Sequence, residues 1–195
     1  MRRSHFTSLR LGLLAAWMSL ATGSARGDDP PPSSKPAFRP DAVFMQFGDG
    51  NRTRTATVGL FWNLPWSGRW AGGQLSGYVD ASIGRWWINE DGMVHSPWVT
   101  QVGLTPVLRY AWGEKSSRRF AELGIGANVL TPIFKDNDRR FSTAFNFGDH
   151  LALGRAFGEG GREEIALRVQ HFSNGGIKQP NPGINFVQVR YSHRF

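Results

Sequence analysis

Two residues with catalytic potential, His171 and Ser173, stand two positions apart in the segment VQHFSNGGIKQPNPGIN, which spans residues 169–185. On a β-strand, residues i and i+2 point to the same face, so these side chains can approach each other. A serine hydroxyl is a weak nucleophile until a base takes its proton, and an imidazole is the most common base. The pair therefore fits nucleophilic hydrolysis, but a histidine that ends a strand beside a loop serine fits the same spacing.

The strand that carries this pair is expected to be amphipathic. Leu167 and Val169 share the parity of His171 and Ser173, so all four point to one face. If that face meets lipid, exposing a polar pair on it is energetically unfavourable and indicates a function. Such a position is explained if the substrate is itself a membrane lipid. Asn185 has the parity that turns it to the same face of the next strand, and a short hairpin brings it towards His171.

Alternating runs of apolar and polar residues continue along the chain from residue 41, separated by clusters of Gly, Pro, Asn, Asp and Ser. Alternation with such breaks indicates β-strands. The last two runs carry bulky Arg and Gln on one face and aliphatic or aromatic residues on the other. The sequence predicts eight strands, over residues 42–48, 55–63, 75–88, 99–112, 120–130, 141–157, 164–173 and 186–195.

This pattern favours an all-β fold, an eight-stranded antiparallel transmembrane β-barrel. A membrane barrel faces lipid with apolar residues and its interior with polar ones, and eight strands leave an interior that side chains fill. A soluble barrel of the lipocalin type also alternates and is the alternative fold. Aromatic residues make up 13% of the chain. The expected interfacial belts comprise Trp86–Trp87, Phe61–Trp62, Trp66, Trp70, Trp98 and Trp112. The alternative for some of the aromatic residues is an ordinary place in the core.

Export signals are expected at both ends of the chain. Arginines precede the apolar run 11–20 and small residues follow it, as in a secretory signal peptide. The run is shorter than the roughly 20 residues of a spanning helix, and an uncleaved anchor is the alternative. Phe195 ends an alternating aromatic strand, which resembles the signal read by the outer-membrane assembly machinery. The predicted segments are a signal peptide (1–27), a Pro-rich linker (28–40) and an outer-membrane domain (41–195).

Charge and cysteine content restrict the partners and cofactors. Residues 1–27 hold four Arg and no acid, so their removal lowers the net charge from +8 to +4. Mild basicity in an exported protein suits an anionic lipid or glycolipid surface and does not require nucleic acid. The chain has no Cys, which excludes disulfides, thiolate metal sites and a cysteine nucleophile. The histidines lack metal-ligand spacing, so neither a metal nor another cofactor is expected.

The segment 171–184 resembles the active-site segment of the lipid A 3-O-deacylases of the PagL type, and the segments FAELGIG (120–126) and FSTAFNFGDHLALG (141–154) are similar in texture to that family. The resemblance implies an eight-stranded outer-membrane barrel that hydrolyses the ester-linked acyl chain at the 3 position of lipid A, a component of lipopolysaccharide. It implies Ser173 as the nucleophile and His171 as the base. It also implies Asn181 and the backbone amide near Gly176 as the oxyanion site, with Asn174 supporting the loop.

The sequence departs from the family at Asn185, where the family usually has an acidic residue that orients the histidine. An amide can accept a hydrogen bond from the imidazole, but it cannot offset the charge of the imidazolium that forms during attack. Either Asn185 suffices, another acid serves, or activity is reduced. The candidate substitutes are Glu122, Asp149, Glu163 and Glu164.

The sequence is compatible with two hypotheses about function. The first is an outer-membrane serine hydrolase whose site faces the outer leaflet, since the seventh strand runs outward if both termini are periplasmic. The second is a non-catalytic small outer-membrane barrel with a structural role or a solute- or lipid-binding role, which the neutral Asn185 favours.

Overall fold

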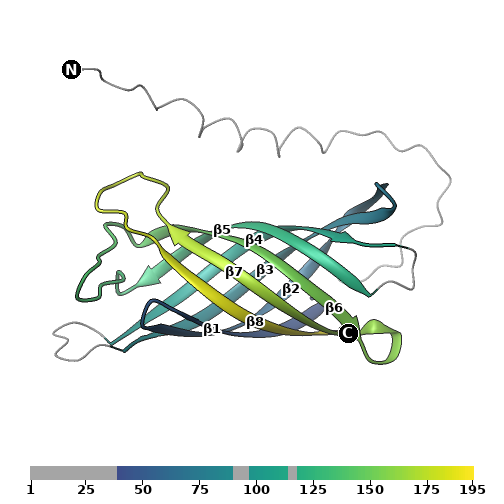
Figure 1. Cartoon of the computed structure of the whole chain (residues 1–195), viewed down its shortest axis with the longest axis horizontal. Helices are drawn as coiled ribbons and strands as arrows, with labels where there is room; N and C mark the ends of the chain where they lie inside the picture. The colour runs from purple at the N-terminus through teal and green to yellow at the C-terminus, as the bar shows by residue number, and fades with distance from the viewer. Residues whose placement is uncertain (1–38, 90–96, 114–117) are drawn as a thin grey trace, which may run out of the picture. The chain divides into compact units, whose positions relative to one another are not determined.

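The computed structural model of the protein describes residues 39–89, 97–113 and 118–195. In it, eight antiparallel strands form a closed barrel in which β8 pairs back with β1 (Figure 1). This confirms the predicted fold. The predicted signal peptide and all of the predicted linker except residues 39–40 lie outside the described residues. The strands are β1 (Ala42–Gly50), β2 (Thr53–Trp70), β3 (Gly73–Ile88), β4 (Trp98–Ala111), β5 (Arg119–Thr131), β6 (Phe145–Phe157), β7 (Glu163–Ser173) and β8 (Ile184–Arg194), with a 3-10 turn, η2 (Glu159–Gly161), before β7.

Two strand boundaries differ from those predicted by more than two residues. β2 continues to Trp70 instead of ending at Asn63, because its pairing with β3 shifts register between Asn63 and Ser67 and then resumes. This irregularity accommodates Pro65, which suggested a strand end in the sequence. β6 begins at Phe145 instead of Phe141. Phe141 belongs to the preceding loop, where it is buried and its amide donates to the carbonyl of Phe134.

The outer surface of the barrel is apolar and its interior is polar. Leu151 and Leu153 on β6 are 64% and 63% exposed, whereas Arg168 and Gln170 on β7 are buried. A soluble barrel has the opposite polarity, so this distribution decides against the lipocalin-type alternative and fits a lipid-facing wall. Among the described residues, no helix has the length and apolar character needed to cross a membrane.

Side chains fill the interior in two zones. At one end Trp86 packs edge-on against Phe134, Phe172 and Phe186. Further along the interior, Arg109 pairs with Glu122 at 2.6 Å and with Glu164 at 2.7 Å. Buried charges are tolerated when they are paired and hydrogen-bonded. The interior is therefore a packed core of side chains, aromatic at one end and with paired charges further along.

The prediction for the aromatic belts is wrong for Trp86 and Phe61, both of which are fully buried. Neighbouring residues on a strand point to opposite faces, so only one member of each predicted pair can face lipid. Trp87 and Trp98 are exposed near one end of the barrel, and Trp66, Trp70 and Trp112 are exposed near the other.

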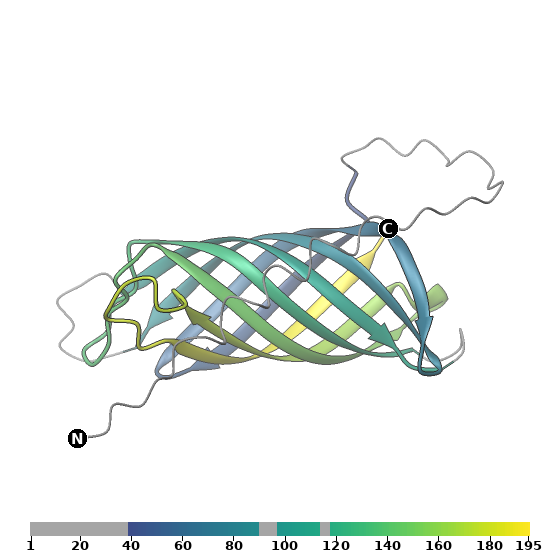
Figure 2. The same ribbon diagram turned by 90° about the horizontal axis from the view of Figure 1, so that it is seen from above.

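The connections define two ends of the barrel. The turn 51–52 and the segments 132–144 and 174–183 share one end, which we call the site end. The turn 71–72, the turn 158–162, the start of β1 and the end of β8 share the other, which we call the far end. In both views the loop before β6 and the yellow loop before β8 lie side by side at the site end (Figures 1 and 2).

Candidate active site

His171 and Asn185 face each other across β7 and β8. The two residues are direct partners in the strand register, and His171 Nδ1 lies 2.7 Å from Asn185 Oδ1. An amide oxygen can only accept, so the imidazole Nδ1–H donates this bond. The tautomer inferred from this partner leaves the lone pair on Nε2. The ring is thus oriented, and Nε2 is the nitrogen that can act as a base.

Gly183, just before β8, provides the space in which the imidazole lies. A Cβ atom at this position would stand 2.6 Å from His171 Cε1 and 3.2 Å from Nε2. Its φ of +69° is also a backbone conformation that favours glycine. Any larger residue at position 183 must displace the imidazole or strain the loop.

Ser173 ends β7 on the same face as His171. The outward neighbours Leu167 and Val169 are exposed, while Phe172 points inward and is buried. Within the described part of the chain, no hydrogen bond joins Ser173 to His171. Ser173 Oγ instead lies 3.4 Å from the amide nitrogen of Gly175. Hydrogen bonds between base and nucleophile are often long without substrate. The missing bond between Ser173 and His171 is therefore compatible with a pair that comes into contact when an ester binds.

Asn174 holds the loop between β7 and β8. Its side chain is fully buried, and its Nδ2 donates to the Lys178 carbonyl at 2.7 Å and to Ser142 Oγ at 3.0 Å. Its Oδ1 accepts from the Gly176 amide at 2.9 Å. Its own backbone amide donates to Asn181 Oδ1 at 2.9 Å. The structure therefore brings Asn174, Gly176 and Asn181 together beside Ser173.

These contacts single out one residue that the sequence did not. The Gly176 amide is already used by Asn174, whereas the Gly175 amide is the backbone donor next to Ser173 Oγ. Gly175 and Gly176 both have positive φ. Two consecutive glycines look alike in a sequence, so only the folded loop distinguishes which amide faces the serine.

The four acids considered as substitutes occupy three different environments. Glu122 and Glu164 are buried inside the barrel, where both pair with Arg109. Glu163 lies at the far end and contacts His193. Asp149 stands directly opposite His171 in the register of β6 and β7 and is exposed on the outer face. Asp149 is thus the one of the four that neighbours the imidazole, on the side away from Asn185.

Comparison with known proteins identifies the family of this chain. The model of the family described as lipid A 3-O-deacylase (PagL) matches residues 56–194, which is most of the chain. The chain belongs to this family. Two curated relatives bear the name lipid A deacylase PagL. The relative from Bordetella bronchiseptica is 36% identical over 78% of this chain and 83% of its own length, and the one from Pseudomonas aeruginosa is 30% identical over 94% and 95%.

A solved structure supports the same relationship at the level of the fold. The crystal structure of the outer membrane enzyme PagL aligns with a TM-score of 0.67 at 27% identity, covering 79% of this chain and 99% of that one. The resemblance seen in the sequence to the lipid A 3-O-deacylase family is therefore confirmed, together with the barrel that it implied.

Proposed function

We propose that this outer-membrane hydrolase removes the ester-linked acyl chain at the 3 position of lipid A by nucleophilic catalysis. His171 Nε2 takes the proton of Ser173 Oγ as the oxygen attacks the ester carbonyl. The imidazolium then donates that proton to the leaving sugar oxygen. Water hydrolyses the acyl-enzyme and restores Ser173. The observation that carries this proposal is the imidazole held by Asn185 on the same outward face as Ser173, in a chain of the lipid A 3-O-deacylase family.

The negative charge that develops on the ester oxygen needs donors beside Ser173. The Gly175 amide is near Oγ, and Asn174 fixes both the Gly176 amide and the side chain of Asn181. We assign the oxyanion site to this loop, with the Gly175 amide, next to Gly176, as backbone donor and Asn181 Nδ2 as side-chain donor. Removal of one such donor typically costs about 10²–10³ in rate.

Asn185 is neutral and orients His171 from β8, and Asp149 is the neighbour of His171 on the opposite side, on β6. An anion near the imidazole stabilises the imidazolium formed during attack. Asp149 makes no hydrogen bond to His171 in the described structure, so its effect acts through space. We therefore assign orientation to Asn185 and partial charge compensation to Asp149.

The location of the site suits a membrane substrate. His171 and Ser173 interrupt an apolar outer surface, so a lipid can reach them sideways from the bilayer. The far end carries the start of β1 and the end of β8, and a barrel whose termini are periplasmic places the site end at the outer leaflet. The proposal includes cleavage of residues 1–27, a linker at 28–40, and insertion of residues 41–195 by the outer-membrane assembly machinery.

Mass spectrometry of lipid A tests the activity directly. Cells that express the protein should contain lipid A that lacks one hydroxyacyl chain, and cells that express Ser173→Ala at equal outer-membrane levels should not. Unchanged lipid A in the wild-type strain would instead support the non-catalytic barrel, the reading that the neutral Asn185 leaves open.

A further inference from the structure

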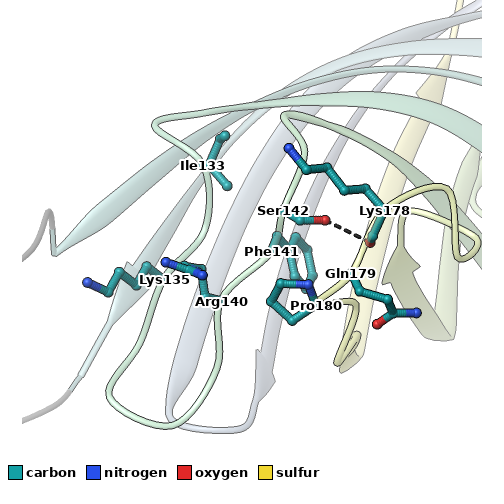
Figure 3. A pocket seen from close by; sticks show the side chains of 8 residues that line it. All are labelled: Ile133, Lys135, Arg140, Phe141, Ser142, Lys178, Gln179 and Pro180. Atoms are coloured by element: carbon teal, nitrogen blue, oxygen red, sulfur yellow. Dashed lines mark hydrogen bonds between the residues drawn. The ribbon is translucent and has the colours of Figure 1, made fainter.

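A pocket of about 360 Å³ lies at the site end between the loop before β6 and the loop before β8 (Figure 3). Its size is within the range of small-molecule sites. One part of the lining is apolar and the rest carries three cationic side chains. The lining residues are Ile133, Lys135, Arg140, Phe141, Ser142, Lys178, Gln179 and Pro180.

Two of the cations, Lys135 and Arg140, are forced together by the fold. They are direct partners in an antiparallel bridge, and Figure 3 draws them next to each other. The residues on either side, Phe134 and Phe141, are buried with ring centroids 5.2 Å apart. Like charges directly opposite each other across a bridge are destabilising. The arrangement therefore costs stability unless an anion lies between them.

Arg139, next to Arg140, is a cation of this loop whose charge is neutralised within the loop. Arg139 is tied to Asp136, with Nη2 2.6 Å from the carboxylate. Within the described part of the chain, no carboxylate forms an ion pair with Lys135, Arg140 or Lys178. The loop thus neutralises one of its cations internally and leaves the charges that line the pocket for another anion.

Lys178 links the pocket to the candidate active site. Its carbonyl accepts from Ser142 Oγ at 2.7 Å and from Asn174 Nδ2 at 2.7 Å. Asn174 directly follows Ser173. Figure 3 shows the Lys178 side chain extending over Ser142. Whatever occupies the pocket is therefore close to the loop that carries the nucleophile.

We propose that Lys135, Arg140 and Lys178 form a subsite that binds a phosphate group of the lipid A substrate. The inference rests on the proposed deacylase function. Ammonium and guanidinium groups form strong charge-assisted hydrogen bonds with phosphate. The apolar part of the pocket, made by Ile133, Phe141 and Pro180, suits the carbon skeleton of an acylated sugar. The pocket thus selects a phosphorylated glycolipid and positions its ester at Ser173.

Steady-state kinetics on two substrates tests the subsite. The enzyme is assayed in neutral detergent micelles with lipid A that retains its phosphates and with lipid A from which they have been removed. The variant carries Lys135→Gln, Arg140→Gln and Lys178→Gln, which leave the Lys178 carbonyl in place. The matched control is Arg69→Gln, which removes an exposed cation at the far end.

The triple variant should raise KM for phosphorylated lipid A roughly tenfold, as three partly exposed ion pairs of ordinary strength would. Its kcat should stay near the wild-type value, and its KM for dephosphorylated lipid A should match that of the wild type and of Arg69→Gln. Equal KM values on the phosphorylated substrate would overturn the subsite while leaving the deacylase intact. An equal loss on both substrates would assign the three residues to the loop structure and also overturn it.

Two further comparisons distinguish a substrate phosphate from a membrane phosphate, and a failure of the subsite from a failure of the proposed function. If the defect appears only when phosphatidylglycerol vesicles replace neutral micelles, whatever the phosphorylation of the substrate, the cations bind the membrane surface and the substrate subsite is wrong. If the wild type deacylates neither substrate, the proposed function itself fails. That outcome is distinct from any result in which the wild type is active.

Discussion

The strands β7 and β8 carry two cross-strand histidine pairs, one at each end. At the site end His171 Nδ1 lies 2.7 Å from Asn185 Oδ1, and at the far end His193 Nδ1 lies 2.7 Å from Glu163 Oε1. Both pairs stand directly opposite in the register and on the outer face. The two histidines are therefore oriented by the same device, and their surroundings distinguish them.

The surroundings differ in charge and in what lies beyond the ring. At the far end the partner is a carboxylate that also accepts a bond from Tyr191, an arrangement suited to a charged anchor at a membrane interface. At the site end the partner is a neutral amide, which orients the imidazole and brings no charge. Only His171 has a serine two residues further along its strand and a glycine against its ring. The comparison shows that an oriented histidine becomes a candidate base through what its second nitrogen can reach.

The largest effect should come from removing the base or the nucleophile. His171→Ala and Ser173→Ala should each lower deacylation by at least about 10³-fold while the barrel still folds, and the double variant should be no worse, because the two residues act as a unit. The measurements are the rate on purified lipid A and the heat-dependent shift of the barrel on a gel. His193→Ala is the matched control and should retain activity. A fully active His171→Ala or Ser173→Ala variant would end the serine-hydrolase assignment.

A second large effect should follow from filling the space beside His171. In Gly183→Ala the new methyl group meets His171 Cε1, so the imidazole must move and the rate should fall by about 10²-fold, as for other misplaced catalytic groups. Gly160→Ala at the far end is matched, because Gly160 also has a positive φ but no atom within 4 Å of the new methyl group. It should carry backbone strain without loss of rate. If Gly183→Ala is as active as Gly160→Ala, the new methyl group does not displace the imidazole and the role assigned to Gly183 is wrong.

Much of this contrast is readable in the sequence, because parity on a strand is local. The alternation of β7 and β8 alone predicted that His171, Ser173 and Asn185 share the outer face. The same rule, applied to the adjacent pairs Trp86–Trp87 and Phe61–Trp62, requires one member of each pair to face the interior. In the structure these members are Trp86 and Phe61. Membership of a face was therefore predictable wherever the strand itself was recognised.

What the sequence could not predict depends on pairings between distant segments. The neighbour of His171 on the other side is Asp149 because of the register between β6 and β7, and nothing local to either residue encodes it. The pocket forms because Phe134 and Phe141 are buried and turn Lys135 and Arg140 outward as partners. The sixth strand was predicted to begin at Phe141, so the prediction missed the loop that forms the pocket.

A moderate effect should come from the partners of His171. Asn185→Ala should lower the rate about tenfold or more, because general-base catalysis is worth about 10²–10⁴ and depends on orientation. Asn185→Asp and Asn185→Glu should match or exceed the wild type, since an anion also stabilises the imidazolium. Rates on purified lipid A decide the matter. If Asn185→Ala is as active as the wild type, the imidazole is oriented by another group.

Asp149→Asn should have a smaller effect on the same step. The carboxylate neighbours His171 but is exposed, so its removal should cost about threefold in rate, the size of a screened charge interaction. The loss should shrink when Asn185→Asp is also present, because that variant supplies the charge more directly. A double-mutant cycle measures this coupling. Fully additive effects would show that Asp149 does not compensate charge on His171.

The smallest effect on catalysis should come from the far-end pair. Glu163→Gln gives His193 an amide partner like that of His171, so it makes the two ends alike in charge. Among the described residues, no serine stands near His193 on the outer face, and the pair is partly exposed. The rate should therefore change by less than about twofold, and the barrel should keep its resistance to heat. The measurements are the rate on lipid A and the gel shift after heating, with His171→Ala as the contrasting variant. A marked loss of rate in Glu163→Gln would mean that the charge at the far end influences the site along β7 and β8, and the two pairs could no longer be treated as independent.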